Sequence, residues 1–185
     1  MSDVEILKLL SVTLTRDKQD ILEGELQRYG MATNWTIKQI LRQHLTSPTR
    51  TIQVLQDTFF EKFDKRVQYF EDVAKTARVE ISNHRRLAKT VRSMRDKTPF
   101  FKPGRLILSQ PIIKLEKQAV IVFIPDGSVL GIPFDKRSRN RLAERIEDIL
   151  RNEKPGEINR NYERIRITWN REGFADIDVR SLQSK

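Results

Sequence analysis

The chain has 185 residues, of which 38% are hydrophobic, enough for one large domain or two small ones with a core. It has no cysteine, no run of about 20 apolar residues and no secretory pattern in its first five residues. This excludes disulfides, thiolate nucleophiles and cysteine-based zinc sites, and it favours a cytoplasmic protein with no membrane partner. Its 35 lysines and arginines against 25 aspartates and glutamates give a formal net charge of +10, which attracts polyanions.

The first half of the chain predicts one strand and three helices. Residues 4–14 are rich in Val, Ile and Leu and predict a strand, and Thr15 is a good N-cap for a helix over 16–44 that we expect to be interrupted near Gly30. A second helix follows Pro48, with an apolar face that includes Phe59, Phe60 and Phe63. Helical periodicity then runs from Val67 to Met94, with a core face and a basic face on one helix.

The second half changes to short aliphatic runs, which predict strands at 106–108, 112–115, 119–124 and 129–134. The segment 125–128 (Pro-Asp-Gly-Ser) predicts a turn, because Pro presets φ and Gly accepts a positive φ. An amphipathic helix from about Ser138 to Asn152 precedes two strands, 163–169 and 174–180, joined by a hairpin turn at 170–173. Helices followed by strands predict an α+β fold. We expect a three-helix bundle beside a small antiparallel β-barrel or sheet, completed by the N-terminal strand.

Several short motifs occur in a particular order along nearly the whole chain. They are a first strand, Leu14-Thr15-Arg16-Asp17-Lys18-Gln19 at a helix start, Thr33-Asn34-Trp35, a long basic helix, Thr98-Pro99-Phe100, Leu106-Ile107-Leu108, and a hairpin of Ile165 to Trp169 with Phe174 to Val179. This order resembles the N-terminal half of the TnpB-type transposon-encoded RNA-guided nucleases, relatives of type V CRISPR effectors.

The resemblance implies a domain division and a function. Segments 1–14 and 98–185 would form a wedge-like β-barrel with one inserted helix, and 15–97 a helical recognition-like lobe. In that family the two parts grip guide RNA and the guide–target duplex, while a RuvC-like domain further on cuts. This chain has no first nuclease strand of that kind and no cysteines. The resemblance therefore implies binding without catalysis or cofactor, by a natural short relative or a piece of a longer protein.

The positive charge is clustered. Between residues 75 and 105 there are ten basic residues against two acidic ones, a net charge of +8, and between 136 and 171 eleven against six, a net charge of +5. Arginine suits phosphate because its planar fork donates two hydrogen bonds at once. The predicted nucleic-acid-binding residues are Arg78, Arg85, Arg86, Lys89, Arg92, Arg95, Lys97, Lys102 and Arg105, and, at a helix start whose amides would add to phosphate affinity, Lys136, Arg137 and Arg139.

Other residues have ordinary structural interpretations. We expect Trp35, Tyr69 and Trp169 to pack in the core rather than stack on bases, and Asp176 and Asp178 to pair with Arg164 and Arg166 rather than bind metal. The histidines, His44 and His84, lack the spacing of zinc ligands.

Nucleic-acid binding is the first functional hypothesis, with RNA or an RNA–DNA duplex favoured and DNA left open. The second is an assembly or regulatory adaptor that docks on a separate protein chain, for example one supplying a nuclease, through an exposed apolar patch around Phe59, Phe60 and Phe63. A dimeric DNA-binding repressor is a third.

Overall fold

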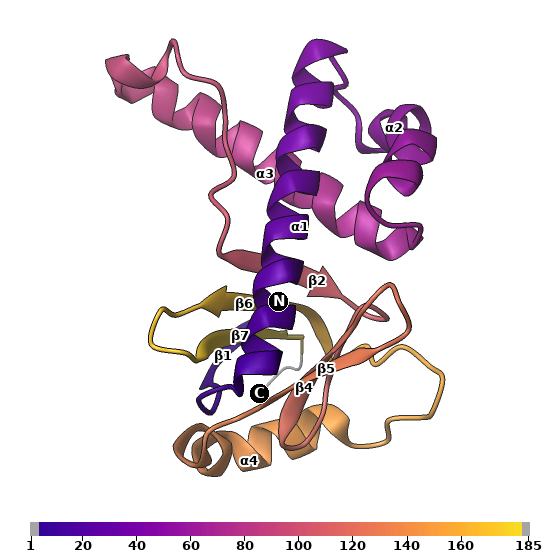
Figure 1. The fold of residues 1–185 in the computed structure, drawn as a ribbon, viewed down its shortest axis with the longest axis vertical. Helices are drawn as coiled ribbons and strands as arrows, with labels where there is room; N and C mark the ends of the chain where they lie inside the picture. The colour runs from indigo at the N-terminus through magenta and orange to yellow at the C-terminus, as the bar shows by residue number, and fades with distance from the viewer. Residues whose placement is uncertain (1–3, 183–185) are drawn as a thin grey trace. The chain divides into compact units, whose positions relative to one another are not determined.

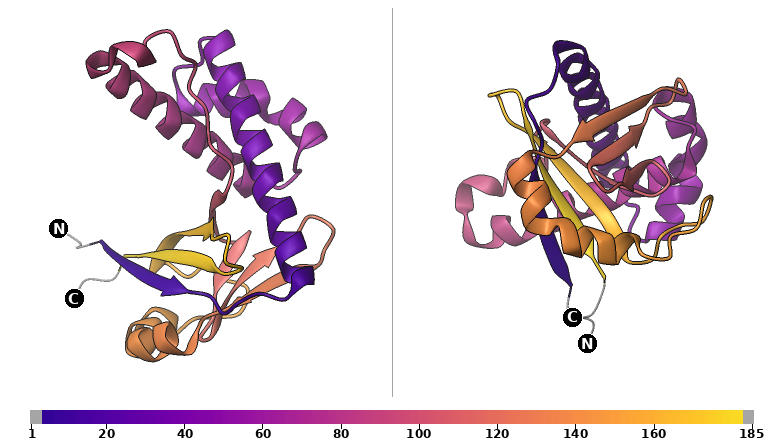
Figure 2. Two further views of the ribbon diagram at one scale, coloured as in Figure 1. Left: turned by 60° about the vertical axis from the view of Figure 1, so that its left-hand side comes forward. Right: turned by 90° about the horizontal axis from the view of Figure 1, so that it is seen from below.

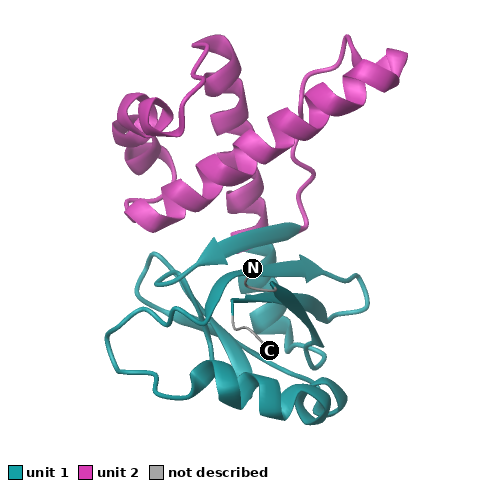
Figure 3. Cartoon of the chain, turned by 180° about the vertical axis from the view of Figure 1, so that it is seen from behind, with its two compact units in different colours: residues 1–24, 105–185 teal, residues 25–104 magenta. Residues whose placement is uncertain are grey.

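A computed structural model describes residues 4–182 as a mixed α+β chain, which confirms the predicted fold class (Figure 1). The chain divides into two compact units, 1–24 with 105–185, and 25–104 (Figure 3). The outermost residues of the predicted wedge-like segments, 1–3 and 183–185, lie outside the described residues. The first boundary falls inside the first helix, so that residues 16–24 belong to the strand-rich unit. At the start of this helix the Gln19 side chain donates to the Leu14 carbonyl at 2.8 Å.

The strand-rich unit contains two antiparallel sheets, which do not form a closed barrel. One has the order β1-β7-β6-β2 and the other β3-β4-β5. The strands are β1 (Glu5–Leu10), β2 (Arg105–Ser109), β3 (Ile113–Leu115), β4 (Ala119–Phe123), β5 (Val129–Pro133), β6 (Tyr162–Trp169) and β7 (Ala175–Ser181). The barrel alternative is therefore wrong and the sheet alternative is confirmed.

The N-terminal strand completes the larger sheet, as the sequence predicts. β1 pairs antiparallel with β7, with Leu7 opposite Val179 and Leu9 opposite Ile177, and all four of these side chains are buried. The other edge of β1 lies against α4 (Lys136–Leu150), where the Leu10 amide donates to Ser138 Oγ at 3.0 Å and Arg141 donates to the Lys8 carbonyl at 2.7 Å (Figure 2). An edge strand that meets a helix in this way has fewer free groups for pairing with another chain.

Both predicted turns are present. Gly127, between β4 and β5, has φ +90°, and Gly173, between β6 and β7, has φ +96°. Their missing side chains permit this left-handed backbone.

The helical unit contains most of α1 (Arg16–Arg42), α2 (Pro48–Lys62), α3 (Val67–Thr90) and a short 3₁₀ turn, η1 (Arg92–Met94). The expected interruption of α1 near Gly30 is wrong, since the helix is continuous. Gly30 instead permits a close approach: a Cβ placed there would lie 3.2 Å from Cγ of Pro103. The core is aromatic, with Tyr29, Phe59, Tyr69, Phe70 and Phe101 all almost fully buried.

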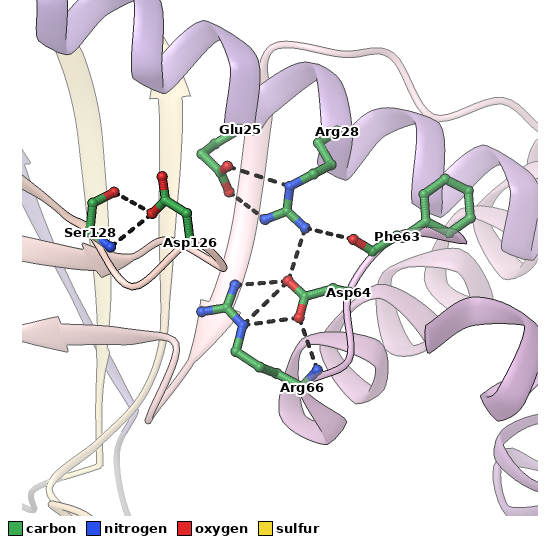
Figure 4. A network of polar contacts seen from close by, with 7 residues as sticks. All are labelled: Glu25, Arg28, Phe63, Asp64, Arg66, Asp126 and Ser128. Atoms are coloured by element: carbon green, nitrogen blue, oxygen red, sulfur yellow. Dashed lines mark hydrogen bonds and ion pairs between the residues drawn. The ribbon is translucent and has the colours of Figure 1, made fainter. Parts of the chain in front are cut away.

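A network of charged side chains fixes the turn between α2 and α3 (Figure 4). Asp64 is buried and accepts hydrogen bonds from Arg28 at 2.9 Å and from Arg66 at 2.8 Å. Arg28 also donates to Glu25 at 2.5 Å, and its guanidinium lies 4.5 Å from the centre of the Tyr69 ring. Burial alone would raise the pKa of Asp64, but the hydrogen bonds from Arg66 and Arg28 outweigh that effect and lower it.

Candidate nucleic-acid interface

Four polar residues lie along one stripe of α3, at the spacings of four, three and four residues that place side chains on the same helix face. They are Arg78, Ser82, Arg85 and Lys89, and we call them the α3 basic surface. Ser82, Arg85 and Lys89 are exposed and Arg78 is half-buried, whereas Val73, Ala74 and Ala77 of the same helix are buried. The structure therefore brings together three of the predicted binding residues, Arg78, Arg85 and Lys89, on one stripe of a single helix.

The α3 basic surface borders a depression of about 320 Å³ within the helical unit. One wall comes from the end of α1 and the turn after it, including His44 and Thr46, and the other from Arg78, Ser82 and Arg85. The turn is shaped by His44, which has φ +53° and lets the Leu45 amide donate back to the Ile40 carbonyl at 3.0 Å, a common end for a helix. None of the described residues that line this depression is acidic.

Arg78 differs from an ordinary surface arginine because part of its guanidinium is buried without a carboxylate partner. Its Nη1 atom is buried and, among the described residues, no group accepts a hydrogen bond from it. Burial lowers the pKa of Arg78, and no carboxylate offsets that effect. Because arginine stays charged in proteins, the site holds a partly desolvated cation that a bound anion would satisfy.

The predicted single helix from Val67 to Met94 is wrong at its end. α3 stops at Thr90, Val91 has extended backbone angles, and Arg92 lies in η1. The consecutive β-branched residues Thr90 and Val91 have low helix propensity, which favours a stop at this point. Arg95 folds back and donates from Nε to the Ala88 carbonyl at 3.2 Å, so it occupies a carbonyl of the last helical turn.

The remaining residues of the 75–105 cluster are distributed over different elements. Arg86 is exposed and donates to Asn83 of its own helix at 2.6 Å. Lys97 and Lys102 are exposed in the segment that follows η1. Arg105 lies on β2, in the strand-rich unit, and so is not part of the α3 basic surface.

The second predicted cluster lies in the first turn of α4. Lys136 and Arg137 are exposed and Arg139 is half-buried. We expected the backbone amides at this helix start to add to phosphate affinity. One of them, the Ser138 amide, already donates at 2.7 Å to the carboxylate of the N-cap residue Asp135. A phosphate there would have to compete with an existing negative charge.

The outer face of the β1-β7-β6-β2 sheet is a basic surface that the sequence analysis did not assign. A depression of about 330 Å³ on this face is lined by Lys8, Arg164, Arg166 and Arg180 together with Asp178, Ile6 and Ile107. We call these residues the sheet basic surface. The signal for it was the alternation of arginine with isoleucine in β6, at positions 164 to 167, which we interpreted only as ion pairing.

The sheet basic surface is partly neutralised from within. Arg166 pairs with Asp178 across the strands at 2.5 Å, which confirms one of the predicted ion pairs, and Arg180 lies 3.3 Å from Glu163. By contrast, Nε of Arg164 is buried and has no hydrogen-bond acceptor in the described part of the chain. Because Arg166 and Arg180 have carboxylate partners, this face retains less free positive charge than its number of basic residues suggests.

Of the three aromatic residues expected in the core, Tyr69 is buried, whereas Trp35 and Trp169 are half-buried. Trp35 packs against Phe59 and Phe63, with ring centres 6.2 and 5.6 Å apart, and Tyr69 is buried. Within residues 4–182 no three His, Asp or Glu side chains are grouped so that they could hold a metal ion. No helix in that range is long and apolar enough to cross a membrane.

The cue for the adaptor hypothesis is contradicted. Phe59 is fully buried, and Phe60 and Phe63 are half-buried. Phe59 stacks on Phe70 at 4.3 Å, and Phe60 meets the same ring edge-on. Phe59 and Phe60 pack α2 against α3, and Phe63 packs against Trp35 of α1, so these residues do not form an exposed patch.

No protein-family model matches the chain, and no curated protein sequence matches it. The resemblance to the TnpB-type nucleases stays a prediction.

Proposed function

We propose that this chain binds nucleic acid, without catalysing a reaction on it, by contacting phosphates with the α3 basic surface. The observation that carries the proposal is Arg78, a partly buried guanidinium whose Nη1 has no acceptor in the described residues and which borders a depression without acidic lining. A partly buried cation without a carboxylate partner is less well solvated than an exposed one, and a bound anion would offset that cost.

A phosphate group fits the chemistry of this depression. Arg78 and Arg85 lie on one helix face and offer planar forks that can donate to neighbouring phosphate oxygens, while Ser82 lies between them with a hydroxyl donor. Lys89 extends the same stripe by one further turn. Contacts of this kind hold the backbone of a nucleic acid and are largely independent of sequence.

RNA or an RNA–DNA hybrid is the proposed ligand class, and the cytoplasm the proposed site of action. The choice of RNA follows from the TnpB-type resemblance, and the cytoplasm from a basic chain that has no cysteine. A separate chain supplying a nuclease would be the proposed protein partner.

The test is fluorescence anisotropy with a structured RNA, an RNA–DNA hybrid and duplex DNA over a series of salt concentrations. We expect tight binding to RNA or the hybrid, with a log–log salt slope of about −4 or steeper, because several phosphates release their counterions. Replacing Arg78 and Arg85 together with Ala should reduce the steepness by about 1.5, since each lost phosphate contact removes somewhat less than one unit.

The matched control replaces two exposed basic residues outside the predicted sites, Lys154→Ala with Arg160→Ala. It changes the net charge by the same amount and should leave the slope nearly unchanged. Equal and weak binding of the unmodified protein to all three ligands, or equal losses in the two double variants, would overturn the proposal.

A further inference from the structure

Phe100 is the most exposed large hydrophobic side chain among residues 4–182, with 65% of its surface accessible. Single exposed hydrophobic residues are common and need no explanation by themselves. What distinguishes Phe100 is the way its backbone is held.

The segment that carries Phe100 is fixed to α1 by residues that follow it, Phe101 and Pro103. Asn34 accepts the Phe101 amide at 2.8 Å and donates to the Phe101 carbonyl at 3.0 Å, so one side chain holds both polar groups of the next residue. The Phe101 ring is fully buried and meets Tyr29 edge-on, with ring centres 5.6 Å apart. The chain then passes over Gly30 at Pro103, where there is no room for a side chain without a shift.

These contacts leave the Phe100 ring in solvent on a backbone that is already ordered. A ligand that stacks on it would therefore cost little additional backbone entropy. Pro99, directly before Phe100, restricts the backbone further.

The charges along this segment favour an anionic ligand. Lys97 and Lys102 are exposed and lie within about 11 and 7 Å of Phe100 along even a fully extended chain, and residues 97–105 contain no acidic side chain. An aromatic face between two cations is the combination that proteins use for unpaired nucleotides, in which the ring stacks on a base and the cations meet the phosphates.

We infer that Phe100 is a base-stacking residue, and hence that the ligand presents at least one unpaired nucleotide to this segment. The inference rests on the proposed function, because it assumes a nucleic acid on the chain. It adds a contact with a base to the backbone contacts that we propose for the α3 basic surface.

The experiment compares two RNA probes in the same salt: a single strand with 2-aminopurine at an internal position, and a perfectly paired duplex. Phe100→Leu keeps an apolar side chain but removes the aromatic face, and Phe100→Trp keeps that face. We expect Phe100→Leu to weaken single-strand binding between about fivefold and a hundredfold, to leave the salt slope unchanged, and to abolish the change in 2-aminopurine fluorescence on binding. Phe100→Trp should restore all three properties, and duplex binding should be the same in every variant.

The control is Ile158→Ala, a residue with 63% exposure in the strand-rich unit, which should bind both probes as the unmodified protein does. If the unmodified protein binds the probes with a steep salt slope but Phe100→Leu has no effect, stacking is wrong while phosphate binding stands. If Phe100→Leu weakens both probes equally, the ring makes a general apolar contact and stacking is again wrong. If the unmodified protein binds neither probe, the proposed function fails, and stacking with it.

Discussion

Two regions of the helical unit use half-buried arginines in opposite ways. At the turn between α2 and α3, Arg28 and Arg66 surround the buried carboxylate of Asp64, and every charge has a partner within 3 Å. At the depression beside the end of α1, Arg78 is half-buried and its Nη1 atom has no acceptor among the described residues. The residue type is the same, so the presence of a carboxylate decides the role. The first region stabilises the fold, while the second keeps a cation available.

The sheet basic surface lies between these extremes. Arg166 has a carboxylate partner in Asp178, whereas Nε of Arg164 has no acceptor within the described chain. By its number of basic residues, this face is comparable to the α3 basic surface. It has less positive charge available to a ligand, because some of its arginines already pair with carboxylates.

The largest effect should come from removing the carboxylate of the paired region. Asp64→Asn leaves Arg28 and Arg66 without their common counter-ion, and we expect it to reduce the free energy of unfolding by about 2–4 kcal/mol. Urea denaturation measures this loss. Asp57→Asn, at an exposed acidic residue of α2, is the control and should change stability by less than about 0.5 kcal/mol. Equal losses in the two variants would show that the network is not a structural centre.

The same carboxylate should make stability depend on pH. The pKa of Asp64 in the folded protein lies below its ordinary value of 3.8, so its stabilising contribution is complete above that value and is lost as the pH falls through the lower, folded pKa. The gap in stability between the unmodified protein and Asp64→Asn should therefore narrow below about pH 4. A gap that stays constant from pH 7 to pH 3 would contradict the lowered pKa.

Removing the Arg78 guanidinium, unlike removing the Asp64 carboxylate, should weaken RNA binding without lowering the stability of the fold. Arg78→Met keeps most of the side-chain volume and removes a cation that lacks a partner. We expect RNA affinity to fall about tenfold, while the free energy of unfolding stays the same or rises by up to about 1 kcal/mol. Anisotropy and urea denaturation of the same preparation measure both quantities. A loss of stability as large as that of Asp64→Asn would mean that Arg78 is a structural residue.

Much of the secondary structure could be predicted because local signals and burial agree in this chain. The alternation of apolar residues in β1 and β7, the helical periodicity of α3 and the glycine-containing turns each specify a local conformation that packing then preserves. The interruption at Gly30 was predicted wrongly because a glycine can serve two purposes, and only the position of Pro103, more than 70 residues away in the chain, shows which one applies.

The candidate site was predictable in part for the same reason. Helical spacing places Arg78, Arg85 and Lys89 on one stripe of α3, so a local pattern was sufficient for them. The lack of an acceptor for Arg78, and the pairing of Arg166 with Asp178 on a basic face made from four strands, depend on register and tertiary packing. A sequence reports how many charges exist but not which of them are already neutralised.

The smallest expected effect comes from a variant that tests whether ion pairing within the sheet basic surface is the reason why it should bind phosphate less well than the α3 basic surface. Asp178→Asn keeps the shape of the side chain and releases Arg166 from its cross-strand partner, so the sheet basic surface gains one positive charge that is free to meet a phosphate. We expect RNA to bind about two- to fivefold more tightly at low salt, with a salt slope steeper by about 1. The stability should fall by no more than about 1 kcal/mol, because the pair is partly exposed to solvent.

Asp148→Asn, which removes an acidic partner of Arg145 and Arg151 on α4, changes the net charge equally and is the matched control. If both variants tighten binding to the same degree, the protein's overall charge explains the gain, and the sheet basic surface has no part in the contact. If only Asp178→Asn does so, a single carboxylate is enough to keep this face from binding as the α3 basic surface does.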